Sequence, residues 1–315
     1  MNGPDSSVDI SVVLATYNRR VLLPRAIWSV LAHRDVNFEL IVVDDASTDD
    51  SAGYLASLGD PRIITHVADK NLGPSGARNL GLRMARAPVV AFLDSDDAYL
   101  PGRLTTPLRV LAAEPTVVCV LSSARKYDRA TPRDAIIPDL KLASEAFEWA
   151  LICDLIPVES TSITVRRAAA LAAGGFCDAL RRTEDREFLI RLARHGAGRL
   201  IADVLWEKFW SDEGLSAEWD STAQALIAFV KQRPEYVTRF AKLGSYLATK
   251  ILVGHIRDKH YAAFLRDLAA LRAAGLVSSN PLRALASHLE VKRYRRATSG
   301  AQALARLQHA PESWR

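Results

Sequence analysis

The chain has 315 residues, of which 49% are hydrophobic and 24% are charged, and its formal net charge is +5. This composition is typical of a folded globular protein and excludes collagen-like and low-complexity chains. Its apolar runs, such as Val8 to Ala15 and Pro88 to Leu93, end well short of the roughly 18 residues of a membrane span. We therefore expect about two globular domains and no integral membrane protein.

The two ends of the chain differ in charge. The first seven residues, Met1 to Ser7, lack the basic and apolar segments of a signal peptide, which predicts a cytoplasmic protein. Residues 1–216 carry 25 Lys or Arg and 29 Asp or Glu, whereas residues 217–315 carry 16 and 7. The basic excess, densest at Lys292 to Arg296, predicts peripheral contact with an anionic membrane at its inner face and no nucleic-acid partner. A solvated basic surface is the alternative.

The first hundred residues alternate β-branched runs with helical patterns, which predicts a mostly parallel sheet with helices on its faces. Four runs are short enough to be buried strands: Ile10 to Leu14, Glu39 to Val43, Ile63 to Val67 and Val89 to Leu93. Apolar side chains at helical spacing predict a helix before the second and the fourth strand: Leu22, Ala26, Ile27, Val30 and Leu31, then Ala77, Leu80, Met84 and Ala85.

Later residues have a mixed pattern up to about residue 216, with expected strands at Val117 to Ser122 and Ser162 to Val165 and a helix from Asp185 to His195. From Ala217 onward the pattern is helical only. We therefore predict two domains, a catalytic α/β domain over residues 1–216 and a basic helical region over residues 217–315. The three cysteines, Cys119, Cys153 and Cys177, form no Cys-x-x-Cys pair, and we expect them to be small buried hydrophobic side chains.

Polar residues follow the predicted strands, at the edge of a parallel sheet where ligands bind. Three of them, Asp94, Asp96 and Asp97, lie within four residues. At about 4 Å and an effective dielectric near 20, each like-charged pair would cost roughly 4 kcal/mol, so we expect a cation there. Carboxylate oxygens suit Mg²⁺ or Mn²⁺, which takes further ligands from substrate phosphates. The alternative is that Asp96 or Asp97 only caps the turn before Pro101.

Four segments in order make the chain resemble a family 2 glycosyltransferase with the GT-A fold, a Rossmann-like sheet that here is followed by a C-terminal helical region. They are Ala15 to Arg19, Val43 to Asp49, Asn71 to Gly81, and Phe92 to Asp97. The shorter segments Gly174 to Phe176 and Thr183 to Asp185 extend the resemblance to about residue 195. The resemblance does not cover the last hundred residues.

The resemblance implies a nucleotide-sugar donor and assigns residues to it. A carboxylate at Asp45 can accept a hydrogen bond from a base N–H, and the Tyr17 ring can lie against the base. The resemblance places Asp94 near the ribose and Asp96, with Asp94, on Mn²⁺ or Mg²⁺. The full set of expected substrate-binding residues is Thr16, Tyr17, Arg19, Asp45, Arg78 and Asp94. For Arg78 the alternative is a solvated helix side chain, and Asp44 is expected to be structural.

The Glu184–Asp185 pair resembles the family's acidic pair whose aspartate is the catalytic base, which implies Asp185 as base and inversion of configuration. The alternative is that both acids only favour a helix N-terminus. The family's later histidine is missing, because the segment from Phe209 to Ser216 contains none. Asp212 or another phosphate-binding group could replace it. The Gln-x-x-Arg-Trp signature of processive synthases is also absent, which predicts transfer of one sugar.

The sequence thus predicts an inverting, metal-dependent transferase that moves a sugar from a nucleotide-sugar donor, a UDP-sugar by preference, to a saccharide or lipid-linked acceptor in polysaccharide synthesis. The alternative is a non-catalytic nucleotide-sugar-binding or scaffold protein of the same fold. A nucleotidyltransferase is disfavoured because Ala15 to Asn18 is not a Gly-rich phosphate loop. A receiver domain is disfavoured because it would be complete in about 120 residues and would not need the later acidic cluster.

Overall fold

The computed structural model describes residues 8–128, 131–209, 222–278, 280–298, 302 and 304 of the chain. It divides into two compact units. The sheet unit comprises residues 1–148 and 156–211, and the helical unit comprises residues 149–155 and 212–315. The predicted boundary at Ala217 lies outside the described residues, and the assignment of a catalytic domain and a separate helical domain remains a prediction.

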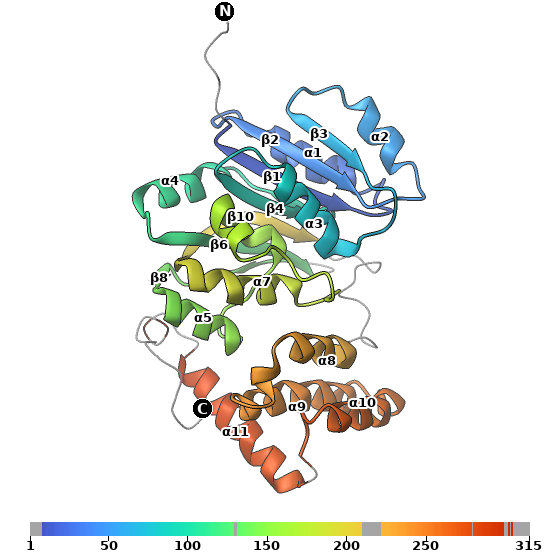
Figure 1. Cartoon of the computed structure of the whole chain (residues 1–315), viewed down its shortest axis with the longest axis vertical. Helices are drawn as coiled ribbons and strands as arrows, with labels where there is room; N and C mark the ends of the chain where they lie inside the picture. Colours follow the sequence, from blue (N-terminus) through green and yellow to red (C-terminus); the bar gives the residue numbers. More distant parts are fainter. Residues whose placement is uncertain are drawn as a thin grey trace, which may run out of the picture. The chain divides into compact units, whose positions relative to one another are not determined.

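A ten-stranded sheet forms the centre of the sheet unit, and the main order of its strands is β3-β2-β1-β4-β9-β6-β10-β5 (Figure 1). The first four strands are parallel and match the predicted strands within two residues. They are β1 (Ile10–Thr16), β2 (Phe38–Asp44), β3 (Ile63–Val67) and β4 (Val89–Asp94). The predicted Rossmann-like α/β class is confirmed.

The other half of the sheet is mixed. Strand β10 pairs parallel with β6, whereas β9 is antiparallel to both β4 and β6, and β5 is antiparallel to β10. Two short strands are attached outside the main order, β7 on β6 and β8 on β10. The bounds are β5 (Asp97–Tyr99), β6 (Val117–Asp128), β7 (Thr131–Ala135), β8 (Leu140–Leu142), β9 (Ile163–Arg166) and β10 (Ala197–Phe209).

Helices cover both faces of the parallel half because alternate strand residues point to opposite faces. On one face, the buried side chains of α1 (Leu23–Leu31) join Ile10, Val12 and Leu14 of β1 in one hydrophobic core. On the other face, α3 (Gly73–Met84) approaches β1 so closely that a Cβ on Gly81 would lie 2.4 Å from Val13 Cγ1. Figure 1 shows α1 behind the sheet and α3 in front of it.

Five further helices complete the sheet unit. The predicted helix at Asp185 is observed as α7, which is followed by a short 3-10 helix from Ala193 to His195. Another 3-10 turn, η1 (Ser160–Ser162), precedes β9. The helices are α2 (Ser51–Ser57), α4 (Thr105–Ala113), α5 (Ser144–Ile152), whose last residues belong to the helical unit, α6 (Arg167–Ala172) and α7 (Glu184–Leu192). All three cysteines are free; Cys119 and Cys153 are buried as predicted, whereas Cys177 is only partly buried.

The helical unit is built from α8 (Thr222–Gln232), the 3-10 turn η5 (Pro234–Tyr236), α9 (Ala241–Arg257), α10 (Tyr261–Ala273) and α11 (Pro281–Thr298). Residues 149–155 pack into this unit although they come from the middle of the chain. The Trp149 indole N–H donates to the Tyr294 hydroxyl at 3.1 Å, and the Tyr236 hydroxyl donates to the Ile152 carbonyl at 2.8 Å. Among the described residues, none of the helices has both the length and the apolar character needed to cross a bilayer.

Candidate active site

Strand register brings the predicted site residues to one edge of the sheet. In the parallel pairs, Thr16 lies opposite Asp44 and Ala15 lies opposite Asp94. The loops that follow β1, β2 and β4 therefore leave the sheet side by side, as expected for the ligand edge of an open α/β sheet.

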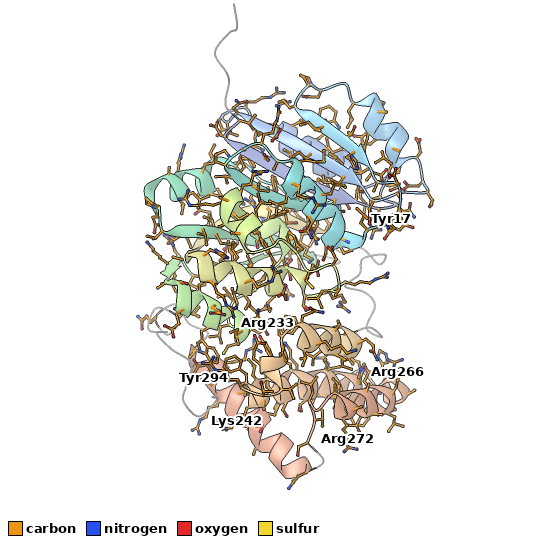
Figure 2. The ribbon with its side chains drawn as sticks, viewed as in Figure 1. Tyr17, Arg233, Lys242, Arg266, Arg272 and Tyr294 are labelled. Carbon is orange, nitrogen blue, oxygen red and sulfur yellow. The ribbon has the colours of Figure 1, made fainter. Side chains whose placement is uncertain are left out.

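The loop after β1 is fixed to the loop after β2 by one asparagine. Asn18 adopts a left-handed conformation (φ +52°), which asparagine tolerates better than most residues. Its side-chain oxygen accepts hydrogen bonds from the backbone N–H groups of Thr48 at 2.7 Å and Asp49 at 3.3 Å. The preceding Tyr17 is 45% exposed and lies at the edge of the unit (Figure 2), so its ring is accessible to a ligand.

Asp45 is buried and connects β2 to the start of α3. Its two carboxylate oxygens accept hydrogen bonds from the backbone N–H of Leu72 at 2.6 Å and of Gly73 at 2.9 Å. Burial raises the pKa of Asp45, although these two bonds oppose the shift. Each carboxylate oxygen has a second lone pair, so the predicted contact with a base N–H stays compatible with this geometry. The neighbouring Asp44 is fully buried and accepts from the Ser47 N–H at 3.0 Å, a contact that suits the structural role expected for it.

The acidic cluster after β4 is organised by a threonine from a distant segment. Thr161 in η1 is fully buried; its hydroxyl accepts from the Asp94 N–H at 3.1 Å and donates to Asp97 Oδ2 at 2.6 Å. The buried Arg103 guanidinium donates to the Thr161 carbonyl at 2.7 Å and so fixes η1. Asp97 is the first residue of β5; its Oδ2 accepts from Thr161 and its Oδ1 has no hydrogen-bond partner among the described residues, so the Asp97 carboxylate does not cap the turn before Pro101.

Burial and mutual repulsion shift the pKa values of two carboxyl groups in this cluster. Burial, followed by the charges of Asp94 and Asp96, raises the pKa of Asp97 well above its ordinary value. Burial and the charge of Asp94 also raise the pKa of Asp96, while Arg19 and Lys208 act in the opposite direction. The structure thus brings the predicted residue Arg19 near Asp96.

The acidic cluster contains a carboxylate oxygen that no described residue engages and that is therefore available to a cation. In the part of the chain that the structure describes, no three His, Cys, Asp or Glu side chains gather closely enough to hold a metal ion by themselves. However, Asp97 Oδ1 is buried and accepts no hydrogen bond from any described residue. An ion held by one or two carboxylates, with water and substrate phosphate as its other ligands, is the usual arrangement for Mg²⁺. The residues therefore fit the expected divalent ion, for which Asp96 and Asp94 remain the predicted ligands.

Arg78 connects the acidic cluster to Glu184, the residue before the predicted base Asp185. It is buried, and it donates to Asp94 Oδ1 at 2.7 Å and to Glu184 Oε1 at 2.8 Å. Despite burial, these two carboxylates raise the pKa of Arg78. Arg78 is therefore not the solvated helix side chain of the alternative reading, and its two ion pairs give it a positioning role in addition to any contact with the nucleotide.

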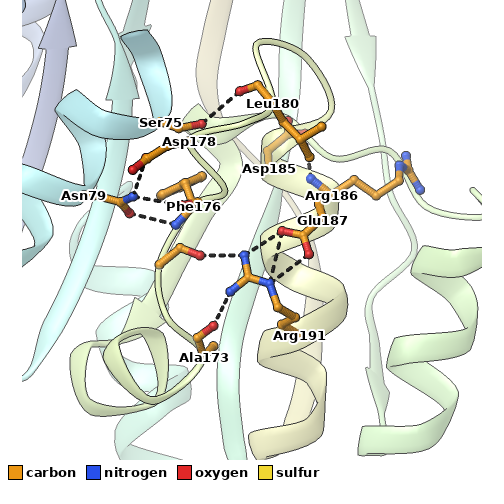
Figure 3. Close-up of polar contacts among 11 residues, drawn as sticks. Ser75, Asn79, Ala173, Phe176, Asp178, Leu180, Asp185, Arg186, Glu187 and Arg191 are labelled. Carbon is orange, nitrogen blue, oxygen red and sulfur yellow. Dashed lines mark hydrogen bonds and ion pairs between the residues drawn. The ribbon is translucent and has the colours of Figure 1, made fainter. Parts of the chain in front are cut away.

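Asp185 lies in the first turn of α7, beside Glu184. Burial, with the charge of Glu184 as the second cause, raises the pKa of Asp185 to about 7. The carboxylate accepts a hydrogen bond from the Arg186 N–H at 2.7 Å (Figure 3). A base whose pKa lies near the operating pH is well suited to accept a proton from a hydroxyl.

The segment from Gly174 to Phe176 joins α3 to α7 (Figure 3). Asn79 on α3 accepts from the Phe176 N–H at 2.7 Å and donates to the Phe176 carbonyl at 2.8 Å. Gly175 has a positive φ of +67°, and a Cβ there would lie 2.3 Å from Asn79 Oδ1. Arg191 of α7 donates to the Gly175 carbonyl at 2.7 Å and pairs with Glu187 at 2.6 Å. These contacts fix the helix that carries Asp185.

Two cations that sequence reasoning missed lie beside the acidic cluster. Lys208 on β10 is the cross-strand partner of Asp97, and its ammonium donates to Glu159 at 2.9 Å. Glu159 also accepts from Lys126, and the charges of Glu159 and Asp97 raise the pKa of Lys208 despite its burial. Arg25 on α1 donates to the Asp96 carbonyl at 2.5 Å. No sequence motif marks these residues, since only the pairing of β5 with β10 and the packing of α1 bring them here. The segment without the family's histidine, including Asp212, lies outside the described residues from Trp210 onward.

A Rossmann-like sheet with an acidic turn after its fourth strand, and with an acidic pair joined to that turn, is the arrangement expected of a glycosyltransferase with the GT-A fold. The family model "Glycosyl transferase family 2" matches residues 11–175, just over half of the chain. The chain therefore belongs to glycosyl transferase family 2.

Two curated relatives each match about a third of the chain. The succinoglycan biosynthesis protein ExoO of Rhizobium meliloti is 44% identical over 106 residues, which are 33% of this chain and 30% of that protein. The Escherichia coli protein WfaP, described as a UDP-Glc:α-D-GlcNAc-diphosphoundecaprenol β-1,3-glucosyltransferase, is 32% identical over 105 residues, which are 33% of this chain and 42% of that protein. The matched segments thus span less than half of these two relatives.

Solved structures support the fold over nearly the whole chain. Residues 1–349 of S. aureus TarS, crystallised in complex with UDP-GlcNAc, align with a TM-score of 0.61 at 18% identity, covering 91% of this chain and 90% of that one. The mannosyltransferase PcManGT from Pyrobaculum calidifontis, in complex with GDP-Man and Mn²⁺, aligns with a TM-score of 0.58 at 21% identity, covering 96% and 86%.

Proposed function

We propose that this glycosyltransferase is an inverting, metal-dependent enzyme that moves a single sugar from a UDP-sugar to a saccharide or lipid-linked acceptor in polysaccharide biosynthesis. One observation carries the proposal. Arg78 joins Asp94 of the acidic cluster to Glu184, so the donor-binding and base-bearing segments belong to one site. The predicted cytoplasmic location, at the inner face of a membrane, is part of the same proposal.

The chemistry divides between the two segments. Tyr17 and Asp45 hold the nucleoside, and Asp96 with Asp94 holds Mn²⁺ or Mg²⁺. A bound divalent ion would neutralise charge on the departing diphosphate as a Lewis acid. Asp185 accepts the proton of the acceptor hydroxyl while that oxygen attacks the anomeric carbon from the face opposite the diphosphate, which inverts its configuration.

The choice of donor and acceptor draws on the relatives. WfaP is named for a UDP-Glc donor and a diphosphoundecaprenol-linked acceptor, TarS was crystallised with UDP-GlcNAc, and PcManGT with GDP-Man and Mn²⁺. A screen of UDP- and GDP-sugars with Mn²⁺ and lipid-linked or saccharide acceptors tests the proposal, with NMR of the product reporting its configuration. Donor binding without any turnover would favour the non-catalytic alternative, and retention of configuration would exclude direct displacement.

The metal role has its own test. We expect UDP to bind about tenfold or more tightly with Mn²⁺ than with a chelator, because the carboxylates otherwise repel its phosphates. Calorimetry on Asp96→Ala should show that this gain is lost. Asp69→Ala removes an exposed aspartate of the same sheet unit and should keep it. Equal UDP affinity with metal and with chelator would contradict the metal role.

A further inference from the structure

The helical unit contains a surface hollow whose lining includes none of the predicted site residues. Three segments line it: the loop after α5, helix α9 and one face of α11. The lining residues are Asp154, Leu155, Tyr246, Lys292, Arg295 and Arg296. All of them belong to the helical unit.

Arg295 is held in one orientation at this hollow. Its guanidinium lies 2.8 Å from Asp154 Oδ2, also donates to the Asp154 carbonyl, and donates to the Tyr246 hydroxyl at 2.9 Å. The guanidinium carbon lies 5.3 Å from the centre of the Tyr246 ring. Because these contacts already restrict the side chain, little further conformational entropy is lost when it binds an anion.

Two more cations line the hollow from the same helix face. Lys292 and Arg296 are four residues apart on α11, so they and Arg295 lie on one face. Lys292 is exposed and forms no hydrogen bond or ion pair with the described residues. Lys250 lies 3.9 Å from Asp154, which is the one carboxylate among the described lining residues. The cations therefore outnumber the anion, and a positive hollow concentrates an anionic ligand.

We propose that this hollow binds a phosphate or diphosphate group. Lys292 and Arg296 supply positive charge at the hollow, and Arg295 adds the N–H groups that Asp154 and Tyr246 do not engage. The group could belong to a soluble phosphate or to a lipid headgroup with a terminal phosphate. The inference does not depend on glycosyl transfer and would stand if the proposed function failed.

Calorimetry with inorganic pyrophosphate in the presence of a chelator tests the soluble source, because chelation removes the metal that the active site would need. We expect saturable binding that weakens about tenfold in the double variant Lys292→Gln, Arg296→Gln. Arg293→Gln is the matched control, since it removes an exposed cation from the same helix outside the hollow. The affinity of Arg293→Gln for pyrophosphate should differ from that of the native protein by less than twofold. Circular dichroism melts check that all variants fold.

Flotation with vesicles of phosphatidylcholine mixed with either phosphatidic acid or phosphatidylglycerol, matched for surface charge, tests the lipid source. A preference for phosphatidic acid, lost in the double variant and kept in Arg293→Gln, would assign the hollow to lipid headgroups with a terminal phosphate. Pyrophosphate binding without that preference would assign it to a soluble phosphate. If neither pyrophosphate binding nor a preference for phosphatidic acid is observed, the proposal is overturned. It is also overturned if the double variant and Arg293→Gln weaken binding equally, because the helix would then present only a generally basic surface.

Discussion

Lys208 and Asp97 face each other as cross-strand partners of β10 and β5. The pairing places an ammonium group beside a carboxylate cluster that is itself expected to attract a divalent cation. Two positive charges compete there unless an anion binds as well, and the diphosphate of a donor would be such an anion. Lys208 therefore lies where it can bind phosphate, a role that is unassigned because the family's histidine is missing.

We predict that Lys208→Met weakens UDP binding about tenfold at saturating Mn²⁺ but strengthens Mn²⁺ binding in the absence of nucleotide. The opposite directions follow because the ammonium attracts phosphate and repels the metal. Lys126→Met is the matched control, since Lys126 shares Glu159 but is not the cross-strand partner of Asp97. If both affinities fell together in Lys208→Met, the lysine would be stabilising the fold of the site.

Asp185→Asn should lower transfer by about 10² or more while donor affinity changes little, because the amide keeps the shape but cannot accept the proton. In the native enzyme, transfer should rise with pH up to about 7 and then level off, since Asp185 with a pKa of about 7 is the base only when ionised. Glu184→Gln should lower the rate of transfer by a smaller factor than Asp185→Asn. Initial rates measured between pH 5.5 and 8.5 check this, and unimpaired turnover in Asp185→Asn would move the base elsewhere.

The raised pKa of Asp185 also predicts a stability effect. The folded protein retains this proton up to about pH 7, whereas an unfolded aspartate loses it near 3.8. The folded state is therefore progressively destabilised, relative to the unfolded state, as the pH rises from about 4 to about 7; the penalty is constant above pH 7 and disappears as the pH falls toward 4. Asp185→Asn, which mimics the neutral form, should unfold at a higher temperature than the native protein at pH 8. The difference should shrink steadily toward pH 4, and a gain independent of pH would contradict the assignment.

Arg78→Met should reduce the free energy of unfolding by about 3–5 kcal/mol, because it leaves the buried Glu184 carboxylate without its cation. It should also shift the pH profile of transfer upward, since Arg78 lowers the pKa of Asp185. The control is Arg83→Met, which removes an exposed arginine from the same helix α3. Denaturant unfolding and rate profiles measure the two effects. If Arg78→Met lowered the stability without changing the pH profile of transfer, the role of Arg78 would be structural only.

The sequence predicts which edge of the sheet carries the site, because local patterns determine where the strands end. Apolar runs locate β1, β2 and β4, and parallel pairing then brings Thr16, Asp45 and Asp94 to one edge. The family resemblance added Asp185, which no local pattern would have connected to them.

The contacts that organise the site depend on distant parts of the chain. Thr161 reaches Asp94 from 67 residues away, and Arg78 reaches Glu184 across 106 residues. Antiparallel pairing of β5 with β10 brings Lys208 to Asp97. Neither hydrophobic periodicity nor a motif encodes such pairings, because they arise only when the mixed half of the sheet has formed. Sequence analysis therefore predicted the acids of the site and the cations Arg19 and Arg78, but not the cations Lys208 and Arg25.

Residues 149–155 give the two units an interleaved order along the chain. A polypeptide ended at residue 216 would retain Trp149 and Cys153 but lose the helices that bury them, and Trp149 would lose its contact with Phe240. Such a fragment would expose apolar surface and tend to aggregate. Recombination that grafts the helical unit onto another family member would have to transfer this seven-residue segment too, so the two halves are expected to evolve as linked parts.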